Sequence, residues 1–317
     1  MRWRSKLVLL TGAAGFIGSH VLRRLMREGA DIIAVDDLSV GTKENIKFFN
    51  GEFYALDVSE KSFTQLMKRY NFDFIFHFGA PSSVILFNKD PEDMFRKTVS
   101  GFLNIMELAV ENSCRKVVYT SSGSIYGEAF PPHSEVVTPK PVNLYGIAKL
   151  TCERIAHYYS RVKDVKSVGL RIFAGYGPGE NHKKEFASPV TIFLNFILND
   201  ESPIVFGDGT QGRDFVYIDD VVEAIIRCAE RDTPPIINVG SGKVYPFNDV
   251  IRLINELLGK DIRPKYVAKP VNYLEITQAD ITLMKNILGI TPLDLKEGLK
   301  KYLKQLNFGQ NKRPMKT

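Results

Sequence analysis

Cysteine is scarce in this sequence, with 3 residues among 317. Cys114, Cys152 and Cys228 are widely spaced, and none belongs to a CxxC pair. This pattern argues against a disulfide framework and against a zinc site, and it favours a reducing, cytoplasmic location. Histidine–carboxylate spacings typical of a metal site are missing as well, so we expect no bound metal.

Long apolar runs are also missing. No stretch approaches the roughly 18 residues that indicate a membrane-spanning helix. The basic N-terminus is followed by the apolar patch KLVLLT, which glycines end at once. We therefore predict a first strand over 6–11 and not an export signal. Low-complexity tracts and internal repeats do not occur.

Charge is only modestly unbalanced. The formal net charge is +6, the pI is near 9.0, and the basic residues spread along the chain apart from the KRPMK tail. Such an excess can attract an anionic small molecule but does not indicate nucleic-acid binding. The length allows one large α/β domain or two smaller ones.

Short apolar runs alternate with amphipathic, helix-like stretches through the first half of the chain. Buried strands are expected over 6–11, 31–36, 52–57, 72–78, 115–121 and 166–173. This alternation is typical of a Rossmann-type, doubly wound parallel sheet with helices on both faces. We assign residues 1–173 to a nucleotide-binding domain, completed by about 214–240.

The regular alternation of predicted strands and helices ends after Phe173. We expect a helix over 188–200, two short strands about a turn within 203–220, and one clear helix over 247–259. Residues 174–213 and 241–317 would form a smaller α/β lobe, with a frayed end over 308–317. A ligand cleft should lie between the lobes, at the carboxyl ends of the strands.

A glycine-rich turn, TGAAGFIGSH, follows the first strand and opens a helix. Gly12, Gly15 and Gly18 would let backbone N–H groups approach a pyrophosphate and let the helix pack close to the sheet. The spacing is G-x-x-G-x-x-G and not the commoner G-x-G-x-x-G, and alone it also suits an ordinary strand–helix turn.

Carboxylates at strand ends favour the nucleotide interpretation. Asp36 ends the second strand, where it could accept hydrogen bonds from the ribose hydroxyls of an adenosine. Asp36 and Asp37 would repel a 2′-phosphate, so we predict NAD and not NADP. Asp57 ends the third strand and could meet the adenine amino group or cap the next helix.

Tyr145 and Lys149 lie four positions apart in LYGIAK and share one helical face. A phenol is a poor base at neutral pH because its ordinary pKa is ~10. The lysine cation, together with an oxidised nicotinamide ring, would lower that pKa, and Tyr145 could then take a proton from a substrate hydroxyl. A tyrosine ring packing on a lysine stem is the simpler alternative. TSSGSIYG (120–127) follows the fifth strand and would place hydroxyls nearby.

Several motifs in one order resemble those of the extended short-chain dehydrogenase/reductases, within the nucleotide-sugar epimerase and dehydratase group. They are TGAAGFIGSH, Asp36, Asp57-Val58, HFGAPSSV, TSSGSIYG, YGIAK, FGDGTQGRDFVYIDDV and NVGSG, spread over about residues 6–300. The resemblance implies Ser122, Tyr145 and Lys149 as the catalytic residues, with Ser122 binding the sugar oxygen.

The resemblance also implies two sets of binding residues. For NAD they are Gly12, Gly15, Phe16, Ile17, Gly18, Asp36, Asp37, Asp57, Val58, Phe78, Gly79, Ala80, Thr98, Tyr145 and Lys149. For the nucleotide sugar they are Ser82, Ser122, Gly123, Tyr145, Phe173, Arg213, Lys269 and Asn272. Arg213 would face the diphosphate, although a carboxylate such as Asp208 or Asp214 is an alternative partner.

The branch of the family follows from the residues after Ser122. Dehydratases carry an acidic pair there, whereas this chain has Gly123 and Ser124, as 4-epimerases have small or hydroxyl residues. We therefore expect a nucleotide-sugar 4-epimerase acting on UDP-glucose and UDP-galactose. A sugar or amino-acid dehydrogenase or reductase of the same fold, and a non-catalytic NAD-sensing scaffold, are the alternatives.

Four positions depart from the family pattern. Ala174 and Thr98 each replace an asparagine, and HFGA replaces His-aliphatic-Ala-Ala. Lys269-Pro270-Val271-Asn272 replaces Arg-Pro-Gly-Asp, and this change alters the expected phosphate contacts and bears on the choice of nucleobase. His77 is expected to be structural and His133 solvated. Apolar residues on more than one face of the helices over 99–113 and 145–162 favour a homodimer, with a monomer as the alternative.

Overall fold

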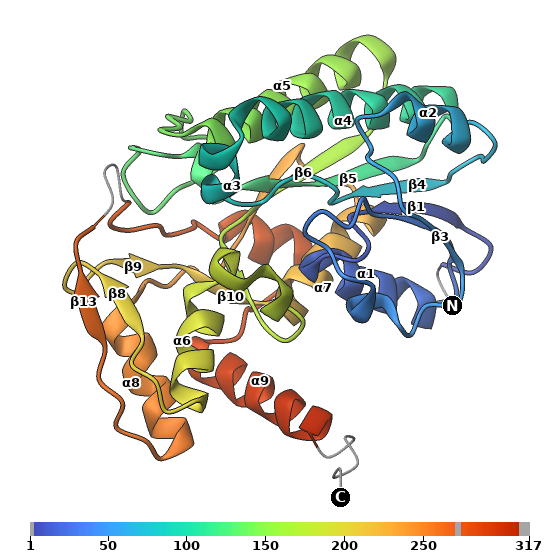
Figure 1. The fold of residues 1–317 in the computed structure, drawn as a ribbon. Helices are drawn as coiled ribbons and strands as arrows, with labels where there is room; N and C mark the ends of the chain where they lie inside the picture. Colours follow the sequence, from blue (N-terminus) through green and yellow to red (C-terminus); the bar gives the residue numbers. More distant parts are fainter. Residues whose placement is uncertain (1–2, 270–273, 311–317) are drawn as a thin grey trace, which may run out of the picture.

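The computed structural model of the chain describes residues 3–269 and 274–310. A seven-stranded sheet at its centre has the order β11-β6-β5-β4-β1-β2-β3 (Figure 1). The strands are β1 (Leu7–Thr11), β2 (Asp31–Val35), β3 (Glu52–Tyr54), β4 (Phe74–His77), β5 (Lys116–Ser122), β6 (Ser167–Ile172) and β11 (Ile236–Val239). Every pairing in this sheet is parallel, which confirms the predicted fold class. The strand order reverses between β1 and β4, and this is where open α/β sheets bind ligands.

Helices cover both faces of the sheet. The helices α2 (Lys61–Met67), α4 (Pro91–Glu111) and α5 (Leu144–Lys163) lie on one face, and α1 (Phe16–Arg27) and α7 (Ile218–Glu230) lie on the other (Figure 1). Successive side chains of β1 point to opposite faces of the sheet, and both faces are buried, so its run is apolar throughout. Leu9 packs into the core under α4, whereas Val8 and Leu10 pack into the core shared with α1 and α7. A strand buried on both faces reads as a continuous hydrophobic run.

The helix that carries the Tyr-x-x-x-Lys pair has well-defined ends. Asn143 caps α5, because its Oδ1 accepts from the Gly146 N–H at 2.8 Å, and Asp164 ends it in a left-handed conformation with φ of 54°. The neighbouring α4 is capped by Asp90 and has Pro91 in its first turn. Both arrangements satisfy backbone groups that a helix end leaves open.

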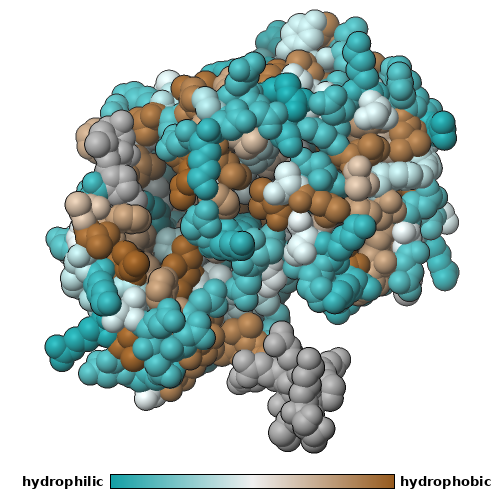
Figure 2. Space-filling model, in the orientation of Figure 1, coloured by the Kyte–Doolittle hydropathy of each residue, from teal (hydrophilic) through white to brown (hydrophobic). Residues whose placement is uncertain are grey.

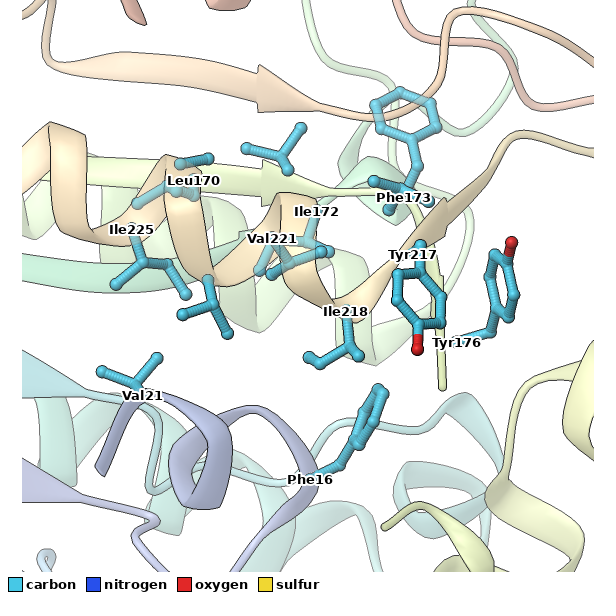
Figure 3. Close-up of a cluster of buried hydrophobic side chains, with 14 of the residues drawn as sticks. Phe16, Val21, Leu170, Ile172, Phe173, Tyr176, Tyr217, Ile218, Val221 and Ile225 are labelled. Atoms are coloured by element: carbon cyan, nitrogen blue, oxygen red, sulfur yellow. The ribbon is translucent and has the colours of Figure 1, made fainter. Parts of the chain in front are cut away.

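The α7 side of the sheet has the larger core. Figure 3 shows Val221 of α7 beside Ile172 of β6, while Ile225 and Ile218 of α7 lie toward Val21 and Phe16 of α1. These side chains are buried. Segment 218–239, which contributes α7 and β11, thus packs into the same layer as the first half of the chain.

The smaller lobe holds α6 (Pro189–Leu198), α8 (Phe247–Leu258), α9 (Leu295–Gln310) and three two-stranded sheets. These pair β10 (Phe215–Tyr217) with β7 (Ala174–Tyr176), β12 (Tyr245–Pro246) with β9 (Gly212–Arg213), and β13 (Lys265–Val267) with β8 (Ile204–Phe206). Shorter elements are α3 (Val84–Lys89), η1 (Lys43–Ile46), η2 (Gly123–Ile125), η3 (Asn181–Phe186) and η4 (Met284–Leu288).

The expected pair of strands about a turn within 203–220 is wrong. Three strands occur there, and each pairs with a partner elsewhere in the chain. The helices α6 and α8 lie where helices were expected, but α9 was not anticipated, and its last residues include the start of the segment expected to be a frayed end. Within the described residues, no helix is both long and apolar enough to cross a bilayer.

Candidate active site

A cavity of about 620 Å³ opens at the carboxyl ends of β1, β2, β4, β5 and β6. The space-filling view shows apolar side chains gathered around a hollow between the sheet and the smaller lobe (Figure 2). Residues from the glycine turn, the strand ends and the start of α5 line one side. Arg213, Leu274 and Thr277 contribute from the other part of the chain.

The glycine turn fits a dinucleotide. Gly12 has φ of +69°, and a Cβ at Gly18 would lie 1.9 Å from the Gly12 carbonyl oxygen. Only glycine allows α1 to begin this close to the strand, and the first N–H groups of that helix then lie beside the cavity. Phe16 and Ile17, at the start of α1, line it.

The acidic residues at the strand ends lie in the same cavity. Asp36 is buried and accepts from the Ala14 N–H at 2.9 Å and the Leu38 N–H at 2.8 Å. Burial raises the pKa of Asp36, while these amide hydrogen bonds lower it in part. Asp37 pairs with Lys97 at 2.8 Å. Asp57 accepts from the Ser59 N–H at 2.8 Å, so it closes a turn before α2 as well as lining the cavity.

Ser122, Tyr145 and Lys149 come together on the cavity wall. Ser122 ends β5, and Tyr145 and Lys149 project from the first two turns of α5. The exposed fractions of the three residues are 7%, 8% and 4%, respectively. Ser122 lies near the Tyr145 phenol and lowers its pKa, and Lys149 Nζ donates to the Thr120 carbonyl at 3.1 Å.

The electrostatics of this group differ from the expectation for lysine. Burial raises the pKa of Tyr145, and the hydrogen bond with Ser122 lowers it only in part. Burial also lowers the pKa of Lys149, whose Nζ lies 6.0 Å from the centre of the Tyr145 ring. The protein alone therefore does not acidify the phenol, and Ser122, more than Lys149, favours the phenolate.

Most of the anticipated binding residues line the cavity. They are Gly12, Gly15, Phe16, Ile17, Gly18, Asp36, Asp37, Asp57, Val58, Phe78, Gly79, Ala80, Ser82, Gly123, Phe173 and Arg213. Arg213 donates from Nη1 to the Gly212 carbonyl at 2.9 Å and to the Glu275 carbonyl at 3.2 Å. Ala174 also lines the cavity, so the missing asparagine concerns a position in the cleft.

Two expected positions lie away from the cavity wall. Thr98 is 1% exposed, and its Oγ1 donates to the Met94 carbonyl within α4 at 2.8 Å. Lys269 Nζ donates to Glu275 Oε1 at 2.7 Å and lies outside the residues that line the cavity. Asn272 falls outside the described residues.

A segment of the cavity wall at 180–189 was not predicted from the sequence. It includes Glu180, His182, Lys183 and Ser188. Lys183 Nζ lies 3.1 Å from Glu180 Oε1 and 4.7 Å from the centre of the Phe16 ring. This charge-rich stretch, which follows the glycines at 175, 177 and 179, has the sequence of an ordinary loop, and only its position after a strand end indicates the cleft.

One of the two histidines is as buried as expected, and the other is more buried than expected. His77 is 4% exposed, as a structural role requires, and its Nδ1 lies 2.8 Å from Thr11 Oγ1. The expected solvation of His133 is wrong, because His133 is 1% exposed and stacks on Tyr126 with ring centres 4.7 Å apart. No group of three or more metal-binding side chains occurs among the described residues.

Comparison with known proteins agrees with this geometry. Residues 8–240 match the NAD dependent epimerase/dehydratase family. UDP-glucose 4-epimerase of Mycolicibacterium smegmatis is 32% identical over 313 residues, covering 96% of this chain and 98% of that one.

Solved structures give the same result. The crystal structure of UDP-glucose 4-epimerase from Thermotoga maritima with UDP-glucose has a TM-score of 0.90 at 32% identity, covering 96% of this chain and 99% of that chain. UDP-N-acetylglucosamine 4-epimerase from Methanobrevibacter ruminantium, in complex with UDP-N-acetylmuramic acid, also has a TM-score of 0.90, at 28% identity and the same coverage. The chain therefore belongs to the NAD-dependent epimerase/dehydratase family, and NAD is its cofactor.

Proposed function

We propose that the protein is a nucleotide-sugar 4-epimerase whose substrates are UDP-glucose and UDP-galactose. The observation that carries this proposal is the Ser122–Tyr145–Lys149 group on the wall of a dinucleotide cleft whose positions 123 and 124 hold no carboxylate. Elimination of water needs an acid beside the reacting carbon. Gly123 and Ser124 cannot supply one.

The chain's own residues then have distinct tasks. Ser122 orients the sugar hydroxyl, and Tyr145 takes its proton and later returns it. The glycine turn and Asp36 would hold NAD, which would supply a hydride acceptor and donor for the same carbon. Lys149 holds a positive charge behind the phenol. Because all three side chains are buried, water has little access to the reacting carbon.

Epimerisation requires the hexose to present both faces to the same acceptor. The nucleotide must therefore supply most of the binding energy while the sugar turns. We propose that Arg213, which lines the cavity, binds the diphosphate, since a guanidinium can contact phosphate with two parallel hydrogen bonds. Of the other expected contacts, Ala174 offers no donor and Lys269 lies off the cavity wall, so the choice of nucleobase and sugar rests on other residues of the cleft.

Conversion of sugars without added cofactor tests the proposal. Purified protein is incubated separately with UDP-galactose, UDP-glucose, UDP-N-acetylglucosamine and UDP-glucuronate, and products are separated by chromatography. We expect interconversion of the first two with no NADH released. A dehydrogenase would instead consume added NAD and accumulate NADH, and conversion of no UDP-hexose would refute the proposal.

We also propose a homodimer formed through α4 and α5. These helices lie side by side on the outside of the sheet (Figure 1). Their outward apolar residues include Leu103, Ile147, Tyr158 and Val162, which are 38%, 40%, 53% and 56% exposed. Exposed apolar patches of this kind mark interfaces. Light scattering during gel filtration should give twice the mass of the chain, and a monomer would refute this arrangement. The free thiols support a cytoplasmic location.

A further inference from the structure

Each of the last three residues of β5 contacts one residue on the face of α5 that packs against the sheet. The Thr120 carbonyl accepts from Lys149 Nζ at 3.1 Å, and Ser122 lies near the Tyr145 phenol on the same cavity wall and lowers its pKa. Ser121 Oγ donates to Glu153 Oε1 at 2.6 Å. Tyr145, Lys149 and Glu153 are four residues apart, so they lie on one face of the helix.

Glu153 is fixed in turn by Arg171 on β6. Arg171 donates from Nε to Glu153 Oε1 at 2.9 Å and from Nη2 to Oε2 at 2.8 Å. Both residues are buried, with exposed fractions of 8% for Glu153 and 4% for Arg171. Burial lowers the pKa of Arg171, but the hydrogen bonds and charge of Glu153 more than offset this and raise it above its ordinary value. The pair is therefore a bidentate clamp inside the protein.

The clamp extends toward the substrate side of the cleft. Arg171 Nη1 donates to Tyr126 Oη at 2.9 Å, and Tyr126 Oη donates to Asn238 Oδ1 at 2.7 Å. Asn238 Nδ2 donates to the His133 carbonyl at 2.8 Å and to the Asp280 carbonyl at 3.2 Å. Asp280 follows the stretch that carries Thr277 on the cavity wall. One hydrogen-bonded chain thus joins α5, β6 and β11 to Asp280, three residues after Thr277.

A buried ion pair of this kind is weak evidence for stability, because the cost of removing two charges from water offsets their attraction. The Glu153–Arg171 pair instead fixes the relative positions of α5, β5 and β6. Strand β6 lies beside β5, with Arg171 opposite Ser121, and α5 packs against β5. Glu153 joins all three elements at one carboxylate.

We propose that Glu153 and Arg171 are positioning residues for the reaction, fixing α5 on β5 so that Tyr145 stays within hydrogen-bond reach of Ser122. This inference rests on the proposed function of Tyr145 as the proton acceptor. Neither residue touches the substrate in this role. Displacement of a reacting group by about 1 Å can cost on the order of 100-fold in rate.

The double variant Glu153→Met/Arg171→Met tests the proposal, because it removes both charges together and leaves neither one unpaired. We expect a folded protein with normal NAD binding, a KM within about 2-fold of wild type, and a kcat lowered about 10- to 100-fold. The acid limb of the pH–rate profile should move to higher pH, because the Ser122 hydrogen bond that lowers the pKa of Tyr145 is weakened.

A matched control is Arg24→Met/Glu223→Met. That pair joins α1 to α7 with Arg24 Nη1 and Glu223 Oε2 2.8 Å apart, and its other hydrogen bonds go to Glu28 and Arg227. We expect wild-type kcat and an unchanged pH profile. If the double variant at 153 and 171 does not fold, Ser121→Ala still breaks one contact of the clamp and should lower kcat several-fold.

Titration of Tyr145 by NMR, with the phenol carbon isotopically labelled and Tyr145→Phe used for assignment, gives a readout that needs no substrate. In the NAD-loaded double variant the phenol should titrate at higher pH than in wild type. Wild-type kcat, pH profile and phenol titration in that variant would overturn the inference. Failure of wild type to convert any UDP-hexose would overturn the proposed function alone, since the titration would still report on the clamp.

Discussion

Lowering the pH should destabilise the protein through His77. This side chain is fully buried at the end of β4, and burial, together with the charge of Lys149, lowers its pKa from 6.5 to about 3. An imidazole that is neutral when folded and charged when unfolded contributes stability above pH 6.5, and the contribution is lost as the pH falls from 6.5 toward 3.

The size of the effect follows from these two pKa values. Between pH 7.5 and pH 5.0 the unfolded chain gains most of one proton at His77 and the folded chain gains almost none, which costs about 2 kcal/mol. At pH 4.0 the cost is about 3.3 kcal/mol. Charged carboxylates also titrate in this range, so the effect of His77 must be isolated by comparison.

Urea unfolding of wild type and His77→Asn at both pH values isolates it, with NAD at the same saturating concentration throughout. Asparagine keeps a polar atom facing Thr11 Oγ1 and does not titrate. Its smaller volume lowers stability at every pH, so the difference between the two pH values is the quantity to compare. Wild type should lose about 2 kcal/mol more than the variant. Equal losses in the two proteins would refute the reasoning.

Three further perturbations give sharp outcomes. Tyr145→Phe should lower kcat by roughly 100- to 10,000-fold with NAD content unchanged, as measured by turnover and by absorbance of the released cofactor; activity near wild type would exclude the phenol as the proton acceptor. Gly18→Ala should abolish co-purification of NAD, because its Cβ would lie 1.9 Å from the Gly12 carbonyl oxygen, and a variant that retains full NAD would contradict the tight turn. Burial raises the pKa of each of the three cysteine thiols to about 12, so a thiol reagent at pH 8 should label the protein only after urea is added, and rapid labelling of native protein would show that they are accessible.

The central sheet could be predicted because its strands are short apolar runs separated by helical patterns. Leu9 and its neighbours are buried on opposite faces, so burial alone makes the strand recognisable in sequence. The cleft followed from the same logic, because parallel strands bring Asp36 and Ser122 to one edge of the sheet.

The smaller lobe could not be predicted in the same way. Strand β8 covers three residues and pairs with β13, about sixty positions further along. Contacts of that kind leave no periodic signal. For the same reason the sequence does not reveal that Arg171, in the middle of an apolar strand, meets Glu153, or that Lys183 lies beside Phe16.

The order of strands has a consequence for biosynthesis. Strand β6 is flanked on its outer side by β11, which is contributed by residues 236–239. A chain growing on the ribosome therefore carries β6 with open backbone N–H and C=O groups for more than sixty residues of synthesis. Unpaired strand edges can pair with other chains. The nascent chain is therefore most prone to aggregation during this interval, and chaperone binding should matter most then.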